Sequence, residues 1–586
     1  MADVSILNKL RQQLALAGVD ALLIPRGDAF NGEEVPPADE RLAHASGFTG
    51  SAGLGIVRNE DAMLFSDGRY TLQMESQKAS GWDCATMPEV MPEDWLLTHH
   101  RNNSLGFDPM LIPLAAFRRM EKKLKTGGIT LVPLDHNPVD AIWPDRPAPP
   151  VRPAFDFDEA VAGLTRQEKI TAMIDAMGDA SETETPRAML ISDPAVLCWL
   201  LNIRGRDLDH TPFVLAFAVL SAEGMVTVYG DDERFASVSQ SGLVVQPAAM
   251  LMNDLAALKG VVLVDPTSCP VALHKVIKAR VIEAENPAVF MKARKTPNER
   301  AAFIATHQTD AVAMIRFLHW FDQTLEKRSV RETEIDAALI NFRSDAADFL
   351  CPSFATICGG GGNGAIVHYR ALPGQDQVIP KDSLCLIDSG GQYRQATTDI
   401  TRTVATGTPP AAMAQAFTHV LKAHIALATS RFPAGTTGVQ LDALTRAPLW
   451  QAGMEFNHGT GHGVGCCLSV HEGPASISKR SMREIEPGMI LSNEPGFYVE
   501  GEYGIRIENL VHVAKDETTD MLMLETISLA PIDQRLIIAA LMTDAEIDWL
   551  NAYHHRIGDE IGPMIRARGD ADLTAWLEAA IAPISR

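Results

Sequence analysis

Five residues in the last 200 positions of the chain carry donor atoms that suit a pair of metal ions. They are four carboxylates and one imidazole: Asp388, Asp399, His462, Glu494 and Glu508. Their surroundings read LIDSGGQY, TTDITRT, HGTGHGVG, NEPG and GIRIEN, so each lies beside glycines or in a strand-like run. Hard oxygen donors offset the mutual repulsion of two divalent ions, and such a site activates water near neutral pH. The pattern predicts a metal-dependent hydrolase.

Each of these residues taken alone has a simpler interpretation. An aspartate after a strand is often a turn or capping residue, a strand glutamate is often solvated, and a single histidine is often structural. The prediction therefore depends on all five donors occurring together, in the order Asp, Asp, His, Glu, Glu.

Two pairs of short strands are expected to position the acids. LCLIDSG is an apolar strand that ends in Asp388, and Asp399 lies eleven residues later in a run rich in β-branched residues. The segment around Glu494 and Glu508 is a second hairpin candidate, in which Pro495 forces Glu494 into extended geometry. Both hairpins would direct their carboxylates into one cavity.

The remaining candidate residues are histidines and one arginine. His458 and His462 are four residues apart, but the glycines of HGTGHGVG disfavour the helix that a helical zinc motif needs. His368 follows CGGGGNG, a run that lacks the Gly-Lys-Ser/Thr ending of a phosphate-binding loop. His368 is a candidate for substrate contact or proton transfer, and His471, in SVHEGP, is a third histidine close to His458 and His462 in the sequence. Arg506, two residues before Glu508, is placed to hold a ligating carboxylate.

Composition limits the class of protein. The 586 residues are 46% hydrophobic and 21% charged, with a formal net charge of −23 and a pI of about 5.2. So acidic a chain argues against a nucleic-acid partner. The eight cysteines contain no CxxC pair and are sparse for a disulfide framework, which favours a reducing compartment. The N-terminal residues do not read as a cationic leader, and the apolar runs are too short to span a membrane. We therefore predict a cytoplasmic enzyme with no membrane partner.

The chain is too long for one hydrophobic core, and the positions of its linker and helix-start signals predict three domains. The proline-rich segment 143–153 is the clearest linker, and the α/β patterns on its two sides repeat loosely. A capping box at Thr296 predicts a long helix, with Ile304, Ala311, Ile315, Leu318 and Leu325 on one face, and Thr543 begins a late helix. We therefore expect domains at 1–150, 151–295 and 296–586.

Together these motifs closely resemble the pita-bread metallopeptidases, and within them aminopeptidase P, also called Xaa-Pro aminopeptidase. The strings IPRGDA, SGFTGSAG, SDGRY, WLLNIRG and DWLNAYH extend the resemblance to the long, three-domain cytosolic form. The resemblance implies an α/β (α+β) fold with two creatinase-like domains before a catalytic pita-bread domain. It also implies a homodimer, two divalent ions, expected to be Mn²⁺, and peptide substrates with proline in the second position.

The resemblance also implies a role for each residue. Asp388 would chelate one ion, Asp399 and Glu508 would bridge the two, and His462 and Glu494 would complete the other. Hydroxide held by both ions would attack the Xaa-Pro carbonyl, and Glu494 would also shuttle the proton. Histidines 368, 458 and 471 would position the substrate and stabilise the oxyanion. The family often has Asp-Glu-Pro-Gly where this chain has Asn493-Glu494-Pro495-Gly496, so the ligand is kept and one neighbouring charge is lost.

Several related functions are less consistent with the sequence. Creatinase-like enzymes and non-catalytic pita-bread binding proteins are expected to lack part of the ligand set, which is complete here. A prolidase-type dipeptidase is the nearest enzymatic alternative, but it usually has one N-terminal domain, whereas about 295 residues precede the third domain here. Methionine aminopeptidases usually lack such an N-terminal pair.

Overall fold

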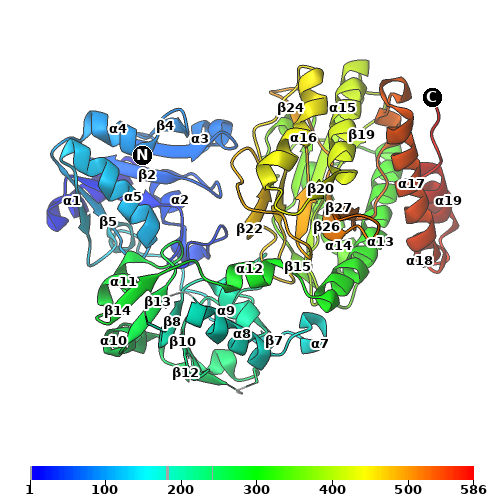
Figure 1. Cartoon of the computed structure of the whole chain (residues 1–586). Helices are drawn as coiled ribbons and strands as arrows, with labels where there is room; N and C mark the ends of the chain where they lie inside the picture. The colour runs from blue at the N-terminus through cyan, green and yellow to red at the C-terminus, as the bar shows by residue number, and fades with distance from the viewer. Residues whose placement is uncertain (1–2, 180–183, 240–241) are drawn as a thin grey trace. The chain divides into compact units, whose positions relative to one another are not determined.

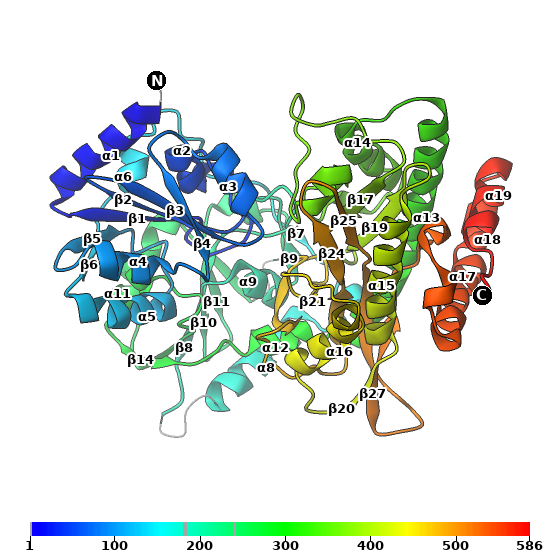
Figure 2. The same cartoon turned by 90° about the horizontal axis from the view of Figure 1, so that it is seen from above.

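The computed structural model describes residues 3–179, 184–239 and 242–586, which form two compact units (Figures 1 and 2). Unit 1 comprises Met1–Asp156 and Thr165–Ala288, and unit 2 comprises Phe157–Leu164 and Val289–Arg586. Both are mixtures of helices and strands, as the sequence predicts. None of the helices within the described ranges has both the length and the hydropathy needed to cross a membrane.

Unit 1 contains the same six-stranded sheet twice, which confirms the repeated module. The strand orders are β4-β3-β2-β1-β5-β6 and β12-β11-β10-β8-β13-β14. In both sheets the first pair of neighbours in this order is parallel, the second and third pairs are antiparallel, and the last two pairs are parallel. Residues 19–24 form a short apolar run of the kind that suits a buried strand, and they contain most of β1, whose first four residues are all buried.

The first module comprises α1 (Asp3–Ala17), β1 (Ala21–Pro25), α2 (Arg41–Ser46), β2 (Leu54–Arg58), β3 (Ala62–Asp67), α3 (Thr71–Gln77), β4 (Asp83–Met87), α4 (Pro92–His99), β5 (Ser104–Phe107), α5 (Leu114–Leu124), β6 (Thr130–Pro133) and α6 (Pro138–Ala141). The second comprises β7 (Phe155–Asp156), α8 (Arg166–Asp179), β8 (Ala188–Ile191), α9 (Pro194–Leu200), β9 (Ile203–Arg204), β10 (Phe217–Ser221), β11 (Val226–Tyr229), β12 (Leu243–Gln246), α10 (Leu251–Ala257), β13 (Val261–Val264), α11 (Val271–Val276) and β14 (Arg280–Glu283).

Unit 2 contains the longest helices of the chain within the described residues. Its helices are α7 (Glu159–Ala162), α12 (Ala288–Ala293, whose first residue belongs to unit 1), α13 (Pro297–Lys327), α14 (Glu332–Arg343), α15 (Ala411–Ala428), α16 (Gly438–Gln451), α17 (Asp544–Glu560), α18 (Gly562–Arg566) and α19 (Ala571–Ala580). Its strands are β15 (Phe349–Pro352), β16 (Ile357–Gly360), β17 (Leu384–Ser389), β18 (Gly391–Tyr393), β19 (Ile400–Ala405), β20 (Arg431–Pro433), β21 (Gly461–Gly463), β22 (Glu472–Ile477), β23 (Ile490–Asn493), β24 (Gly496–Val499), β25 (Tyr503–Arg506), β26 (Asn509–Lys515) and β27 (Met521–Thr526).

Helix α13 begins at the predicted capping box. The Thr296 hydroxyl accepts a hydrogen bond from the Glu299 backbone N–H, and the Glu299 carboxylate accepts one from the Thr296 N–H. Ala311, Ile315 and Leu318 are buried on the predicted face. Ile304 is 44% exposed, so its assignment to that face was wrong. In this part of α13 the buried face is formed instead by Ala302, Phe303, Thr306 and His307, so the face that contacts the core differs from the one that the apolar spacing predicts.

The helices of unit 2 pack around two sheets that carry the candidate site. One sheet has the order β16-β17-β19 and the other β20-β27-β26-β23-β21-β22. Figures 1 and 2 show α15 beside α16, and α13 beside the C-terminal helices α17 to α19. Buried residues of α13, α15 and α17 share one apolar cluster with Ile505 and Ile507, which flank Arg506. The site therefore lies on strands supported by packed helices.

Candidate metal centre

The two aspartates come from one pair of antiparallel strands. Asp388 lies in β17 directly opposite Thr401 in β19, and Asp399 precedes β19 by one residue. The connection turns tightly at Gly390, where a Cβ atom would lie 2.0 Å from the Thr398 carbonyl oxygen. Asp388 and Asp399 are 7% and 3% exposed, so the carboxylates of this predicted hairpin are removed from solvent.

Glycines allow His462 to approach the acids. A Cβ atom at Gly461 would lie 2.0 Å from the Ser492 carbonyl oxygen, so only glycine lets β21 approach β23 this closely. The His462 backbone N–H donates to the Ser492 hydroxyl at 2.9 Å. His462 Nδ1 lies 3.0 Å from the Gly463 carbonyl oxygen, which accepts its proton and leaves Nε2 free to act as a ligand.

The two glutamates project from the ends of a second strand pair. Asn493 at the end of β23 pairs with Asn509 at the start of β26, and Glu494 and Glu508 lie one residue beyond that pair. The Glu508 N–H donates to the Thr401 carbonyl oxygen at 3.1 Å, and the Thr401 hydroxyl donates to Glu508 Oε2 at 2.7 Å. These bonds join the glutamate strand to the aspartate strands.

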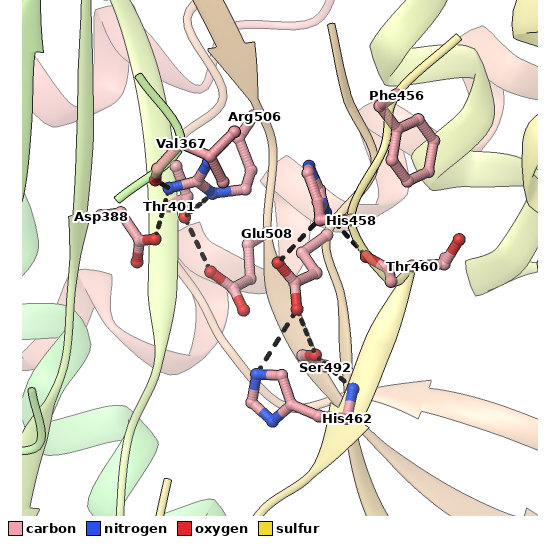
Figure 3. A network of polar contacts seen from close by, with 12 residues as sticks. Val367, Asp388, Thr401, Phe456, His458, Thr460, His462, Ser492, Arg506 and Glu508 are labelled. Atoms are coloured by element: carbon pink, nitrogen blue, oxygen red, sulfur yellow. Dashed lines mark hydrogen bonds and ion pairs between the residues drawn. The ribbon is translucent and has the colours of Figure 1, made fainter. Parts of the chain in front are cut away.

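The predicted donors converge on one space. Asp399, His462 and Glu508 each offer a ligand atom, and these three atoms lie within 4.8 Å of one another. His462 Nε2 is 3.5 Å from Asp399 Oδ2 and 3.4 Å from Glu494 Oε1. Figure 3 shows the side chains of Asp388, Glu508 and His462 around this space.

The donor set fits a divalent metal centre. Asp388 Oδ1 and Asp399 Oδ1 are buried and have no hydrogen-bond partner among the described residues. A buried carboxylate oxygen without a partner is costly unless a cation satisfies it. Four carboxylates with one imidazole are the oxygen-rich set that hard divalent ions prefer.

The electrostatics of the metal-free pocket point the same way. Burial and the charges of neighbouring carboxylates raise the pKa of Asp388 to about 6, although Arg506 opposes this. Burial, followed by the charges of Asp399 and Asp388, raises the pKa of Glu508 well above its usual value. Burial alone would lower the pKa of His462, but its hydrogen bond to Asp399 and the charge of Glu494 raise it to about 9. The four carboxylates outnumber the cationic groups of the pocket, and divalent ions would offset this excess of negative charge.

Arg506 contacts both an acid and an aromatic residue. Its Nη2 donates to Asp388 Oδ2 at 2.6 Å (Figure 3), and its Nη1 donates to the Tyr498 hydroxyl at 2.7 Å. Burial by itself would lower the pKa of the guanidinium, but Tyr498 and Asp388 raise it well above its ordinary value. A charged Arg506 therefore fixes one oxygen of Asp388 and leaves the other for a ligand.

The three additional histidines lie at the same centre. His458 Nε2 is 2.8 Å from the Tyr498 hydroxyl, and His458 Nδ1 is 3.9 Å from Glu494 Oε2. The His471 ring meets the His462 ring edge to face, with centroids 4.4 Å apart. Burial and Arg506 lower the pKa of His458. His368 directly follows Val367, whose carbonyl oxygen lies 3.5 Å from Arg506 Nη2.

Sequence reasoning missed several residues that shape the site. Tyr498 joins Arg506 to His458, Thr401 holds Glu508, and the Ser492 hydroxyl donates to Glu494 Oε1 at 3.1 Å. Thr401 and Ser492 carry no signal beyond proximity in sequence to a predicted ligand. Tyr498 is in the predicted hairpin, but its partners become neighbours only in the folded chain.

Comparisons with known proteins agree with this geometry. The model for metallopeptidase family M24 matches residues 301–515, and its C-terminal region matches 520–584. The creatinase/prolidase N-terminal domain matches twice, at 6–142 and 145–299. Aminopeptidase P2 of Arabidopsis thaliana is 35% identical over 94% of this chain and 84% of its own length. Xaa-Pro aminopeptidase 2 of Homo sapiens is 32% identical over 99% of this chain and 88% of its own.

The chain belongs to the aminopeptidase P family of M24 metallopeptidases.

Solved structures confirm the fold of this M24 protein. The X-prolyl aminopeptidase of Caenorhabditis elegans, described as a cytosolic enzyme with a di-nuclear active site, matches with a TM-score of 0.94 and 31% identity over 100% of both chains. The prolidase of Pyrococcus horikoshii matches 62% of this chain and 99% of its own, with a TM-score of 0.50 and 22% identity. At this level of identity the match shows a similar fold and nothing about function. Two creatinase-type domains followed by an M24 domain are therefore confirmed.

Proposed function

We propose that this chain is a metal-dependent Xaa-Pro aminopeptidase that releases the N-terminal residue of peptides with proline in the second position. The observation that carries the proposal is the convergence of Asp399, His462 and Glu508 in a chain of the aminopeptidase P family. A non-catalytic binding role gives no reason for buried carboxylate oxygens without partners. A prolidase likeness covers 62% of this chain, whereas the aminopeptidase relatives match nearly all of it.

We assign Asp388, Asp399, His462, Glu494 and Glu508 to two divalent ions. In support, the C. elegans relative is described as having a di-nuclear active site, and oxygen-rich donors suit Mn²⁺. Two bound ions would neutralise the carboxylates, activate a water molecule and polarise the scissile carbonyl. Asp399 and Glu508 would lie between the ions, Asp388 would bind one, and His462 with Glu494 would bind the other.

We assign proton transfer to Glu494. Its side chain is 18% exposed, whereas that of Asp399 is 4% exposed, so Glu494 lies on the more accessible side of the cluster. Its Oε1 accepts from the Ser492 hydroxyl, which orients the carboxylate. A carboxylate near solvent and near His458 can accept a proton from water and return it to the leaving proline nitrogen.

The histidines and Arg506 would orient the substrate. The Gly459 carbonyl oxygen accepts the proton of His458 Nδ1, so the neutral imidazole accepts at Nε2 from the Tyr498 hydroxyl and would hold that hydroxyl in place beside the substrate. His368 and His471 would contact the peptide backbone from either side of the cluster. Arg506 stabilises the negative charge of Asp388 and, through Tyr498, fixes His458.

The finer properties of the enzyme are also proposals. We infer domains at 1–150, 151–295 and 296–586, a cytoplasmic location and a homodimer. The cytosolic relative supports the location. Large apolar side chains are exposed on α16 and after β22 (Leu444, 51%; Trp450, 49%; Met482, 73%), and burying them against a second copy of the chain would be favourable.

The proposed function is tested with a peptide panel that varies the second residue. Purified protein loaded with Mn²⁺, Co²⁺ or Zn²⁺ is assayed on Ala-Pro-Ala, Ala-Ala-Ala and the dipeptide Ala-Pro. We expect release of alanine from the Pro-containing tripeptide, with kcat/KM at least about tenfold above the other two substrates. Faster cleavage of the dipeptide would favour a prolidase, and no cleavage with any metal would contradict an enzymatic role.

A further inference from the structure

A buried glutamate outside the metal centre is bound by an unusual number of donors. Glu332 begins α14 and is 0% exposed. Its Oε1 accepts from the Gly360 N–H at 3.0 Å, Asn363 Nδ2 at 3.0 Å and Gln377 Nε2 at 3.3 Å. Its Oε2 accepts from Asn363 Nδ2 at 3.2 Å, the Tyr369 hydroxyl at 2.8 Å and the Gln377 N–H at 3.0 Å.

All of these donors are uncharged and belong to one segment. Asn363 and Tyr369 lie within residues 361–376, and Gly360 and Gln377 lie immediately before and after them. We call residues 361–376 the His368 loop, because they contain that histidine. Gly360 and Gln377 flank the loop, and both bind the same carboxylate. Gln377 Nε2 also donates to the Gly360 carbonyl oxygen at 2.6 Å. Gly360 and Gln377, which form the neck of the loop, are therefore held together at Glu332.

The His368 loop packs against the strand that carries Arg506. A Cβ atom at Gly504 in β25 would lie 1.7 Å from the Gly364 carbonyl oxygen, so the two backbones are in close contact. Arg506 Nη2 reaches the Val367 carbonyl oxygen at 3.5 Å, as Figure 3 shows. His368 directly follows Val367, so the loop brings this histidine beside Arg506 at the candidate metal centre.

We propose that Glu332 is a positioning residue for the reaction: its carboxylate closes the neck of the His368 loop and thereby holds His368 at the metal centre. This inference rests on the proposed function, in which His368 contacts the peptide. Glu332 touches neither the candidate ligands nor the space between them. It acts through the loop, because a long loop holds a side chain in place only where its ends and interior are fixed.

The chemistry of the anchor requires a carboxylate. Each oxygen of Glu332 faces three donor contacts, so a glutamine in either orientation would direct its NH₂ group at donors. Burial and this carboxylate raise the pKa of the Tyr369 hydroxyl, which keeps it protonated as a donor. Glu332→Gln therefore loosens the loop while keeping the size of the side chain.

A matched control is available on the same helix end. Glu334 is two residues away, accepts from the Arg331 N–H at 2.9 Å and pairs with Arg328, and these contacts do not involve the His368 loop. Glu334→Gln removes one carboxylate charge at the N-terminus of α14 and leaves the loop contacts intact. Tyr369→Phe provides a milder change, since it deletes one of the six contacts to Glu332.

The test is a double-mutant cycle in the metal-loaded full chain. Wild type, Glu332→Gln, His368→Ala and the double variant are assayed on Ala-Pro-Ala, with metal content measured in each. We expect Glu332→Gln to retain its metal and to lose at least about tenfold in kcat/KM, because small displacements of a positioned group are costly. In the His368→Ala background the same change should cost less than about twofold, since its effect acts through His368. Equal losses in both backgrounds would overturn the proposal.

Hydrogen exchange supplies a measurement that does not depend on activity. In Glu332→Gln and, more weakly, in Tyr369→Phe, amides of 361–376 should exchange faster, while β17 and β19 stay unchanged. Glu334→Gln should leave both the loop and kcat/KM unchanged. Unchanged exchange in the loop of Glu332→Gln would contradict the anchoring role even if the wild type cleaved no Xaa-Pro peptide, so this result separates failure of the inference from failure of the proposed function. If Glu332→Gln does not fold, Tyr369→Phe replaces it in the cycle and the same comparison applies.

Discussion

At the scale of single residues, the candidate centre combines buried negative charge with unsatisfied ligand atoms. Asp388 and Asp399 each keep one oxygen without a partner among the described residues, while their other oxygens face Arg506 and His462. Such an arrangement is unstable by itself and becomes favourable when cations are present. The ligand atoms of the candidate centre are therefore better suited to binding metal ions than to pairing with one another.

Asp399→Asn tests this arrangement directly. The change keeps the shape of the side chain but removes the charge that His462 and the neighbouring ligands share. Loss of a residue that merely supports a metal ligand costs about 10–100-fold, so we expect more than about 100-fold loss of activity here, together with reduced metal content. Metal analysis by mass spectrometry and circular dichroism would separate loss of metal from unfolding.

Asp345→Asn is the matched control, because Asp345 is exposed and pairs with Arg316 at the surface. Exposed ion pairs contribute about 0–1 kcal/mol, so this variant should keep its metal and its activity. An Asp399→Asn protein with normal metal content and turnover would exclude Asp399 as a ligand.

At the scale of elements, two strand pairs and one glycine-rich strand bring together donors that are 120 residues apart in sequence. β17 and β19 carry the aspartates, β23 and β26 end at the glutamates, and β21 brings His462 between them. Close backbone contact at Gly461 makes this approach possible. The site therefore depends on strand spacing as much as on ligand identity.

Gly461→Ala is expected to disturb the site without removing any ligand. Its Cβ would lie 2.0 Å from the Ser492 carbonyl oxygen, so β21 must move and take His462 with it. Overpacking of this kind costs about 1–3 kcal/mol, and we expect a lower midpoint of thermal unfolding, weaker metal binding and a lower kcat.

Gly178→Ala serves as the comparison, since it lies in α8 and its Cβ would meet no atom within 4 Å. Alanine is favoured over glycine in a helix, so this variant should be at least as stable as the wild type. Unaltered metal affinity in Gly461→Ala would show that the close approach of β21 is not needed.

At the scale of the whole molecule, the candidate ligands all lie in unit 2, and unit 1 contains the repeated modules. Metal binding is therefore coupled to the folding of one unit of the chain. A ligand that binds only the folded state stabilises it, by about 2.7 kcal/mol when its concentration is 100 times Kd.

Chelation should consequently lower the unfolding temperature and abolish activity, and Mn²⁺ should restore both. Hydrogen exchange in the chelated protein should increase in β17, β19 and β23, whereas the sheets of unit 1 provide an internal reference that stays constant. Full activity after exhaustive chelation would instead support a metal-independent, creatinase-like reaction.

Association of two copies is expected to bury the exposed apolar side chains around α16. Leu444→Asp replaces one of these side chains with a charge, and we expect sedimentation to shift from dimer to monomer at micromolar concentration, because a buried unpaired charge is strongly unfavourable. Leu72→Asp, at a 48% exposed position in unit 1, is the control. A wild-type protein that sediments as a monomer would contradict the proposed homodimer.

Much of the fold could be predicted because its signals are local. The Thr296 capping box, the buried run of β1 and the two hairpins all follow from residues near one another in sequence. The repeated module was also visible, since both copies use the same order of elements. Ile304 was misassigned because helical periodicity does not indicate where the neighbouring elements end.

The sequence by itself determined which residues are candidate metal ligands, because ligand identity is a property of residue type and the five donors occur together in recognisable strings. Only the tertiary structure decided which oxygens face inward and what holds them. Tyr498, Thr401 and Ser492 meet the site across strands, and Glu332 controls a loop from outside it. Such contacts join residues that are distant in sequence, so they exist only once the sheets and helices have packed.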